Sequence, residues 1–198
     1  MERPILFNTA MVEAILEGRK TQTRRLVKQS LLQHSIEEDG ELWIEDENGD
    51  YWRAEEYAPV HPGDKLYVRE TWKRAMRKFD IFPTQTYYLY KAGEQKKDPL
   101  LIAESKWRPS IHMPKTAARI WLRVKDVRCE RLWAITKKGV KAEGTRIPDW
   151  IMDDDYKMAR YFFWRNVWDP TVKKRMDKWA ANPWVWVIEF ERIEGNAP

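Results

Sequence analysis

The chain has 198 residues, of which 43% are hydrophobic, so it is long and apolar enough for a folded core and is not a disordered protein. Its 36 basic and 31 acidic residues give a net charge of +5, which mildly favours an anionic partner such as nucleic acid. One cysteine, Cys129, excludes an internal disulfide and a cysteine-based zinc site.

The first predicted elements are a short strand and a helix. Residues 4–7 form an apolar run that is typical of a strand, and apolar side chains follow at helical spacing over 11–16. The Thr9 hydroxyl is placed to cap this helix, and Gly18 is placed to end it. We therefore expect the chain after Gly18 to enter a loop or a second strand.

The stretch from Gly18 to Arg25 places four basic side chains, two hydroxyls and one amide within eight residues. So dense a group of donors and cations is not expected in a core, and it indicates a site for an anion or a nucleotide. The phosphate contacts would come from Arg19, Lys20, Arg24 and Arg25. The alternative is a basic loop that is only solvated, as most runs of lysine and arginine are.

Alternating apolar and polar side chains predict strands along the rest of the chain, at 41–45, 50–53, 65–72, 87–90, 118–127 and 184–193. Helices are predicted at 136–144, with Thr136 as the N-cap and Gly144 as the stop, and at 156–168. Residues 73–78 are basic and irregular. Strands spread over the whole length with short helices between them predict an α+β fold built on a small β-barrel.

Several stretches resemble a known family. Gly18-x-Lys20-x-x-Thr23-x-Arg25 is similar to the signature of the ASCH domain, a β-barrel of the PUA-like superfamily, which usually has glutamate at the position of Thr23. Later stretches resemble a phage and prophage branch of this family, at 62–72, 108–114, 142–144 and 182–190. The resemblance runs from residue 3 to about residue 193. It implies one PUA-like domain over residues 1–198, with insertions at about 30–58 and 73–105.

The resemblance also implies a function, because the cleft of such a domain binds RNA, a nucleoside or a modified base. One ASCH branch removes the acetyl group of 4-acetylcytidine with a lysine, a threonine and a glutamate. The motif assigns these roles to Lys20 and Thr23, and order along the chain assigns the third to Glu143, on a short helix after a central strand.

The chemistry sets two conditions on these residues. Threonine is a weak nucleophile, so Lys20 would have to act as its base, with a pKa lowered by burial or by neighbouring cations. Residues 20 and 23 of a flat strand point to opposite faces, so cooperation between Lys20 and Thr23 also requires a bend between them.

Three residues outside the motif are further candidates for contact with a nucleic acid or nucleoside: Arg69, Trp72 and His112. Two of them also have a structural interpretation, since Trp72 is suited to core packing and His112, between prolines, to a structural role. Glu70 is expected to support the fold as a buried ion pair. The histidines at 34, 61 and 112 lack zinc-ligand spacing, so we expect no metal and no cofactor.

Three functions remain open. The first is a hydrolase of an acylated cytidine. The second is a non-catalytic binding module for RNA or a modified base, and a ribonuclease that uses the same basic cleft is a variant of it. The third is a phage assembly protein with an incidental basic loop. Neither a signal peptide nor a long apolar run is found, so we expect a cytoplasmic protein of phage or prophage type without membrane contact.

Overall fold

The computed structural model describes residues 1–78, 86–93, 100–148, 151 and 156–193. The chain divides into two compact units. Unit 1 comprises Met1–Gly18, Asp64–Arg123 and Arg192–Pro198, and unit 2 comprises Arg19–Gly63 and Val124–Glu191. The expectation of one domain over residues 1–198 stays a prediction.

The main sheet of unit 1 joins strands β1 (Glu2–Leu6), β6 (Lys65–Arg69) and the start of β10 (Trp121–Arg131). β1 and β6 run parallel, and β6 pairs antiparallel with residues 121–123. Helix α1 (Thr9–Leu16) follows β1 and buries Val12, Ala14 and Ile15. The strand predicted at 4–7 and the helix predicted at 11–16 are thus confirmed within two residues.

The cap of α1 is Asn8 and not Thr9. The Asn8 side-chain oxygen accepts a hydrogen bond from the Met11 backbone nitrogen at 2.9 Å, and Thr9 is the first helical residue. Asparagine and threonine both cap helices, so sequence alone did not separate two neighbouring candidates. Gly18 has a φ of 73°, the left-handed conformation in which glycine commonly ends a helix.

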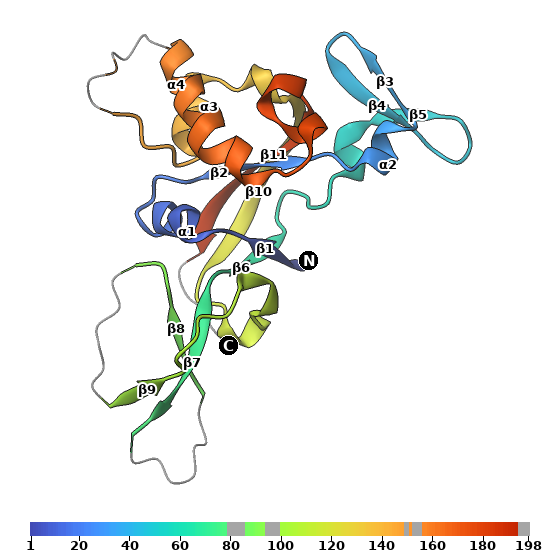
Figure 1. Cartoon of the computed structure of the whole chain (residues 1–198). Coiled ribbons are helices and arrows are strands. Elements are labelled where there is room, and N and C mark those ends of the chain that lie inside the picture. Colours follow the sequence, from blue (N-terminus) through green and yellow to red (C-terminus); the bar gives the residue numbers. More distant parts are fainter. Residues whose placement is uncertain (79–85, 94–99, 149–150, 152–155, 194–198) are drawn as a thin grey trace. The chain divides into compact units, whose positions relative to one another are not determined.

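Unit 1 also holds a three-stranded antiparallel sheet of order β8-β7-β9, drawn in green in Figure 1. Its strands are β7 (Trp72–Arg77), β8 (Tyr87–Tyr90) and β9 (Leu101–Ala103). The prediction of an irregular segment at 73–78 is therefore wrong. Tyr88 and Tyr87 of β8 pair with Arg74 and Ala75, and such cross-strand pairs stabilise a strand that has no apolar alternation of its own.

In unit 2, β2 (Gln22–Leu26) pairs antiparallel with β11 (Trp184–Ile193), and β11 lies beside β10. Helices α3 (Lys137–Ala142) and α4 (Tyr156–Phe163) pack against this sheet, and α4 continues into a π-helical turn at Trp164–Trp168. Thr136 caps α3, as predicted. The core between sheet and helices consists of Leu132, Ile135, Val140, Ala159, Phe163, Trp168, Val185 and Val187.

A second antiparallel sheet of unit 2 has the order β3-β4-β5 (Figure 1). It follows helix α2 (Gln29–Leu32) and consists of β3 (Ser35–Glu38), β4 (Glu41–Glu45) and β5 (Tyr51–Arg53). The predicted hairpin at 41–45 and 50–53 is confirmed, with Gly49 at a φ of 86° in its turn.

The remaining helical segments are short 3₁₀ turns, at Ala54–Tyr57, Ser110–His112, Lys115–Ala117, Leu132–Ala134, Asp169–Thr171, Arg175–Asp177 and Trp179–Ala181. The α+β class is confirmed by these strands and helices. Within the described residues no ladder closes a sheet on itself, so the predicted barrel is not seen. Among the same residues, no helix is long and apolar enough to cross a membrane.

Candidate functional site

Lys20, immediately before β2, is a buried cation with 2% of its surface exposed. Its ammonium donates to Oε2 of Glu143 at 2.7 Å, to the Gln22 carbonyl at 2.8 Å and to the Glu143 carbonyl at 3.1 Å. A backbone bridge between residues 20 and 143 holds the start of β2 against the end of α3. The expectation that this cluster of donors lies outside the core is therefore wrong for Lys20, and also for Gln22, Thr23 and Arg24.

The contact between Lys20 and Glu143 opens a run of six alternating charges, which we call the ion-pair chain. Its members, in order, are Lys20, Glu143, Arg24, Glu130, Arg128 and Glu189. Arg24 bridges two glutamates, with Nη1 3.1 Å from Glu143 and Nη2 2.6 Å from Glu130. Arg128 then contacts Glu130 at 3.3 Å and Glu189 at 2.7 Å. The three cations of the run are thus matched by its three carboxylates, and Arg128 also lies 3.5 Å from the Asp126 carboxylate.

The ion-pair chain runs from the interior to the surface of unit 2. The side-chain exposure is 0% at Lys20 and 3% at Glu143, and it reaches 37% at Arg128. Charges are buried without large loss of stability only where partners and hydrogen bonds replace water. The Gln22 amide supplies such a bond, since its oxygen can accept from Arg24 at 3.1 Å and from Arg128 at 3.3 Å.

Burial also changes the acidity of Lys20. Removal from water lowers the pKa of its ammonium, the Glu143 carboxylate raises it, and the nearby Arg25 and Arg24 guanidinium groups lower it further. Burial is the largest effect, so we take the net direction to be downward. The first chemical condition was a lowered pKa of Lys20, and the pKa is indeed shifted downward.

Thr23 lies on the other face of β2 from Arg24. Arg24 is paired with Val187 and Thr23 with Ile188, and cross-strand partners share a face. Successive side chains of a strand alternate, so the Thr23 hydroxyl points away from the face on which Arg24 meets the helices. Thr23 is buried and, within the described part of the chain, makes no hydrogen bond to Lys20. The second chemical condition, a bend that brings these two side chains together, has no support here.

Arg19 and Arg25 are the more accessible cations of the motif, since both are only partly buried. Arg19 donates from Nη1 to the Gly144 carbonyl at 2.7 Å, so it too lies beside the end of α3. Burial lowers the pKa of Arg25, and the Glu143 carboxylate acts in the opposite direction. The structure thus brings Arg19, Lys20, Arg24 and Glu143 together.

The three remaining candidates, Arg69, Trp72 and His112, belong to unit 1. Trp72 is 1% exposed and packs with Met113 and two alanines, as expected for core packing. His112 is exposed, and Arg69 donates to the Ile111 carbonyl.

Glu70, the neighbour of Arg69, forms its bidentate ion pair with Arg119, at 2.9 Å to each oxygen. The expected buried ion pair at Glu70 is therefore present. Burial raises the pKa of this carboxyl, and the Arg119 guanidinium opposes the rise.

Sequence reasoning missed Arg128, Glu130 and Glu189, the outer half of the ion-pair chain. The neighbours of Arg128 and Glu130 on β10 are half-buried and those of Glu189 on β11 are buried, and charged residues in such alternation are typical of a solvated strand face. The only available signal was the two-residue spacing of Arg128 and Glu130, which places both on one face of β10.

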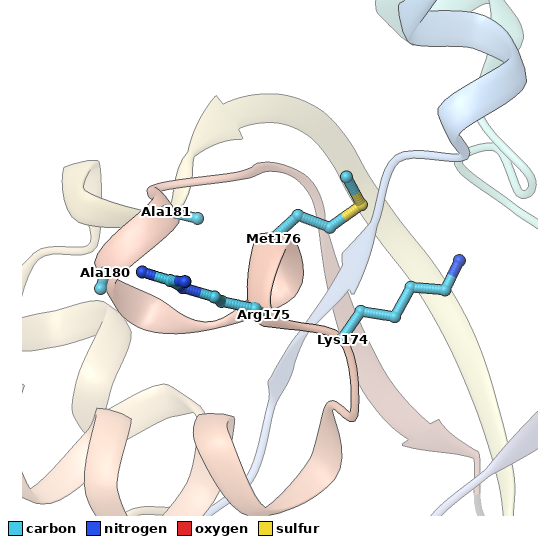
Figure 2. Close-up of a pocket in the computed structure, with 5 residues that line it drawn as sticks. All are labelled: Lys174, Arg175, Met176, Ala180 and Ala181. Atoms are coloured by element: carbon cyan, nitrogen blue, oxygen red, sulfur yellow. The ribbon is translucent and has the colours of Figure 1, made fainter.

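Unit 2 also has a surface pocket of about 620 Å³, shown in Figure 2. It is lined by Lys174, Arg175, Met176, Ala180 and Ala181, from two consecutive 3₁₀ turns. The lining combines two cations with apolar side chains, and none of the candidates from the sequence is part of it. Among the described residues, no group of three or more His, Cys, Asp or Glu side chains is placed to hold a metal ion.

No protein-family model matches the chain, and neither does any curated protein. Among solved structures the chain is similar to a high-resolution crystal structure from Lactobacillus crispatus JV V101. That neighbour is an ASCH domain. The match has 13% sequence identity and a TM-score of 0.37, and it covers 96% of this chain and 79% of the other. The neighbour belongs to the family that the sequence motifs resemble, but a likeness at this level supports no function, which is therefore argued from the residues of this chain.

Proposed function

We propose that this chain is an ASCH-type, PUA-like protein that binds RNA or a modified nucleoside. The observation that carries the proposal is the contact between Lys20 and Glu143. The resemblance couples these two residues although most of the chain separates them, and their charged atoms lie 2.7 Å apart in the interior of unit 2. A random match to a short motif would not require such a distant pair to meet, so the contact supports a functional interpretation of residues 18–25.

The accessible cations of the motif are the contact residues in this proposal. Arg19 and Arg25 are partly exposed, and a guanidinium binds a phosphate or a carbonyl oxygen with two parallel hydrogen bonds. Lys20 and Arg24 are already neutralised by Glu143 and Glu130, so their part is to fix β2 in place.

Hydrolysis of an acylated cytidine is the further step that the resemblance implies. The lowered pKa of Lys20 favours it, because an amine that loses its proton more easily is a better base. The orientation of Thr23 and the burial of Lys20, Thr23 and Glu143 oppose it, since a substrate must reach the nucleophile. Binding is therefore the proposed activity, and hydrolysis is an outcome that the same experiment decides.

The test measures binding and turnover together. Calorimetry with cytidine and 4-acetylcytidine, and fluorescence anisotropy with a labelled RNA oligonucleotide, should detect a ligand. We expect the double variant Arg19→Gln/Arg25→Gln to weaken binding about tenfold or more, as for lost hydrogen bonds to charged groups. The control Arg53→Gln removes an exposed arginine whose partner is Glu41, and it should bind as the wild type does.

Turnover is followed by chromatography of the same 4-acetylcytidine mixtures. Thr23→Val keeps the shape of the side chain and removes only the hydroxyl. Release of cytidine that disappears in this variant would establish a hydrolase, and binding without release would establish a binding module. A wild type that binds neither nucleosides nor RNA would contradict the proposal.

A further inference from the structure

The net charge of the chain resides in one segment. Residues 72–108 contain nine lysines and arginines and four aspartates and glutamates, a net charge of +5. The other residues contain 27 of each sign and are neutral together. The described residues of this segment, 72–78, 86–93 and 100–108, comprise the sheet β8-β7-β9 and the chain that follows it, and we call them the basic arm.

Most cations of the basic arm are exposed. Arg74 and Arg77 on β7 and Lys106 after β9 are exposed, and within the described residues none of the three has a carboxylate partner in an ion pair. The acidic residue of the arm, Glu104, is held by Arg108, with Nε at 2.9 Å and Nη2 at 2.7 Å. The same carboxylate accepts a hydrogen bond from the Arg74 backbone nitrogen at 3.5 Å and attracts the Arg74 guanidinium more weakly than Arg108. Arg77 and Lys106 keep their attraction for phosphate.

An exposed apolar pair lies among these cations. Met76 and Ile102 are cross-strand partners on β7 and β9, and they are 58% and 54% exposed. Arg74 shares their face of the sheet, because it is two residues from Met76. A pocket of about 360 Å³ is formed here by Arg74, Ala75, Met76, Thr86, Ile102, Ala103 and Glu104. Its volume lies in the range of roughly 300–1,000 Å³ that small-molecule sites occupy.

We infer that the basic arm binds single-stranded RNA, with one unpaired base against Met76 and Ile102 and backbone phosphates at Arg74 and Lys106 and, where the strand passes the end of β7, at Arg77 on the opposite face of the sheet. A base in a duplex is stacked and exposes only its edges, so an apolar contact for a base face suits an unpaired strand. Charge complementarity selects the phosphate backbone as the partner. The inference rests on the proposed function for the choice of RNA and adds a second contact surface to it.

The electrostatic part is tested with fluorescence anisotropy over a range of salt concentrations. The probes are a labelled twelve-nucleotide single-stranded RNA and the corresponding duplex. Each phosphate contact with a single strand contributes roughly 0.7 to the slope of log K against log salt, so Arg74→Gln/Arg77→Gln/Lys106→Gln should reduce that slope by about 2. The control Arg53→Gln/Lys125→Gln/Lys138→Gln removes the same charge from exposed sites elsewhere and should keep the slope.

The apolar part is tested with Met76→Ala/Ile102→Ala. Both side chains are exposed, so the variant should fold normally, as circular dichroism will check. A base stacked on an aromatic side chain contributes roughly fivefold or more to single-strand affinity, and the aliphatic pair Met76 and Ile102 should contribute about fivefold at most. We expect a loss of up to this size for the single strand and no change for the duplex.

Two results would overturn the inference. One is an equal loss of affinity in the arm variant and in its control, since binding would then follow net charge alone. The other is duplex affinity equal to or above that of the single strand. In either case nucleoside binding that depends on Arg19 and Arg25 would leave the proposed function standing, because those residues belong to unit 2 and the arm belongs to unit 1.

Discussion

Glu143 holds two buried cations, Lys20 and Arg24, and its removal is the sharpest test of the ion-pair chain. Glu143→Gln leaves positive charge in the interior without its carboxylate, which typically costs about 3–5 kcal/mol of unfolding free energy. We expect a loss of this size in urea denaturation at pH 7. Glu41→Gln, which breaks an exposed pair with Arg53, should cost about 1 kcal/mol or less. Similar losses in the two variants would contradict a stabilising role for the buried pair.

Cys129 offers a second test at the residue scale. Burial raises the pKa of its thiol to about 12, and the Glu55 and Glu130 carboxylates act in the same direction. Only the thiolate reacts, but a thiolate of higher pKa is also more nucleophilic, so the native protein should react with Ellman's reagent at pH 8 about a hundredfold more slowly than the unfolded chain. Absorbance measured with and without 8 M urea checks this, and rapid labelling of the native protein would contradict it.

The residues of the site were only partly predictable. Lys20 and Glu143 emerged from a family resemblance, because no periodicity relates residues so far apart. The burial of Arg24 was not predictable, since residues 22–26 contain one apolar side chain and the carboxylates that neutralise Arg24 come from β10 and the end of α3. A charge can be assigned to the interior only when its partner is known.

The start of α1 yields a prediction at the scale of a single element. Asn8 accepts the hydrogen bond from the Met11 nitrogen, whereas Thr9 is inside the helix. Asn8→Ala should therefore lower the unfolding free energy by about 1 kcal/mol, the typical cost of a lost N-cap. Thr9→Ala should cost clearly less, because alanine is the better helix former. Thermal unfolding of the two variants compares them, and a larger loss from Thr9→Ala would overturn the assignment of the cap.

Elements with a strong pattern of their own were predictable, and elements stabilised by neighbours were not. The strand at 184–193 alternates almost throughout and was predicted with the observed bounds. The strand predicted at 65–72 is two strands, β6 and β7, because the chain leaves the first ladder at Glu70. β7 contains the three basic residues Lys73, Arg74 and Arg77 and acquires its strand structure from the cross-strand pairs with β8 and β9.

At the scale of the whole molecule, formal charge and effective charge differ. The excess positive charge lies in residues 72–108, and elsewhere many cations have carboxylate partners. Arg77→Gln should therefore lower the salt concentration that elutes the protein from a cation exchanger at pH 7 more than Arg53→Gln does, although each variant removes one charge. An equal decrease in the eluting salt concentration for both variants would show that retention depends on net charge and not on where the charge lies.

The α+β class was predictable from strands and helices mixed along the chain, but the order of strands was not. Placing β2 beside β11 requires knowledge of which edges meet, and hydrophobic periodicity carries no such information. The ion-pair chain depends on that order, since it crosses from β2 through β10 to β11. This dependence is why only its inner end could be anticipated.

The pairing of β2 with β11 also has a consequence for synthesis in the cell. Thr23 is made long before its partner Ile188. At about 5–20 residues per second, the ribosome needs roughly ten to thirty seconds to produce the partner. During that interval β2 lacks the strand with which it pairs in the sheet and its cations remain hydrated, so the native interior of unit 2 cannot form before β11 has been made. A nascent chain of this protein should therefore bind holding chaperones until β11 emerges.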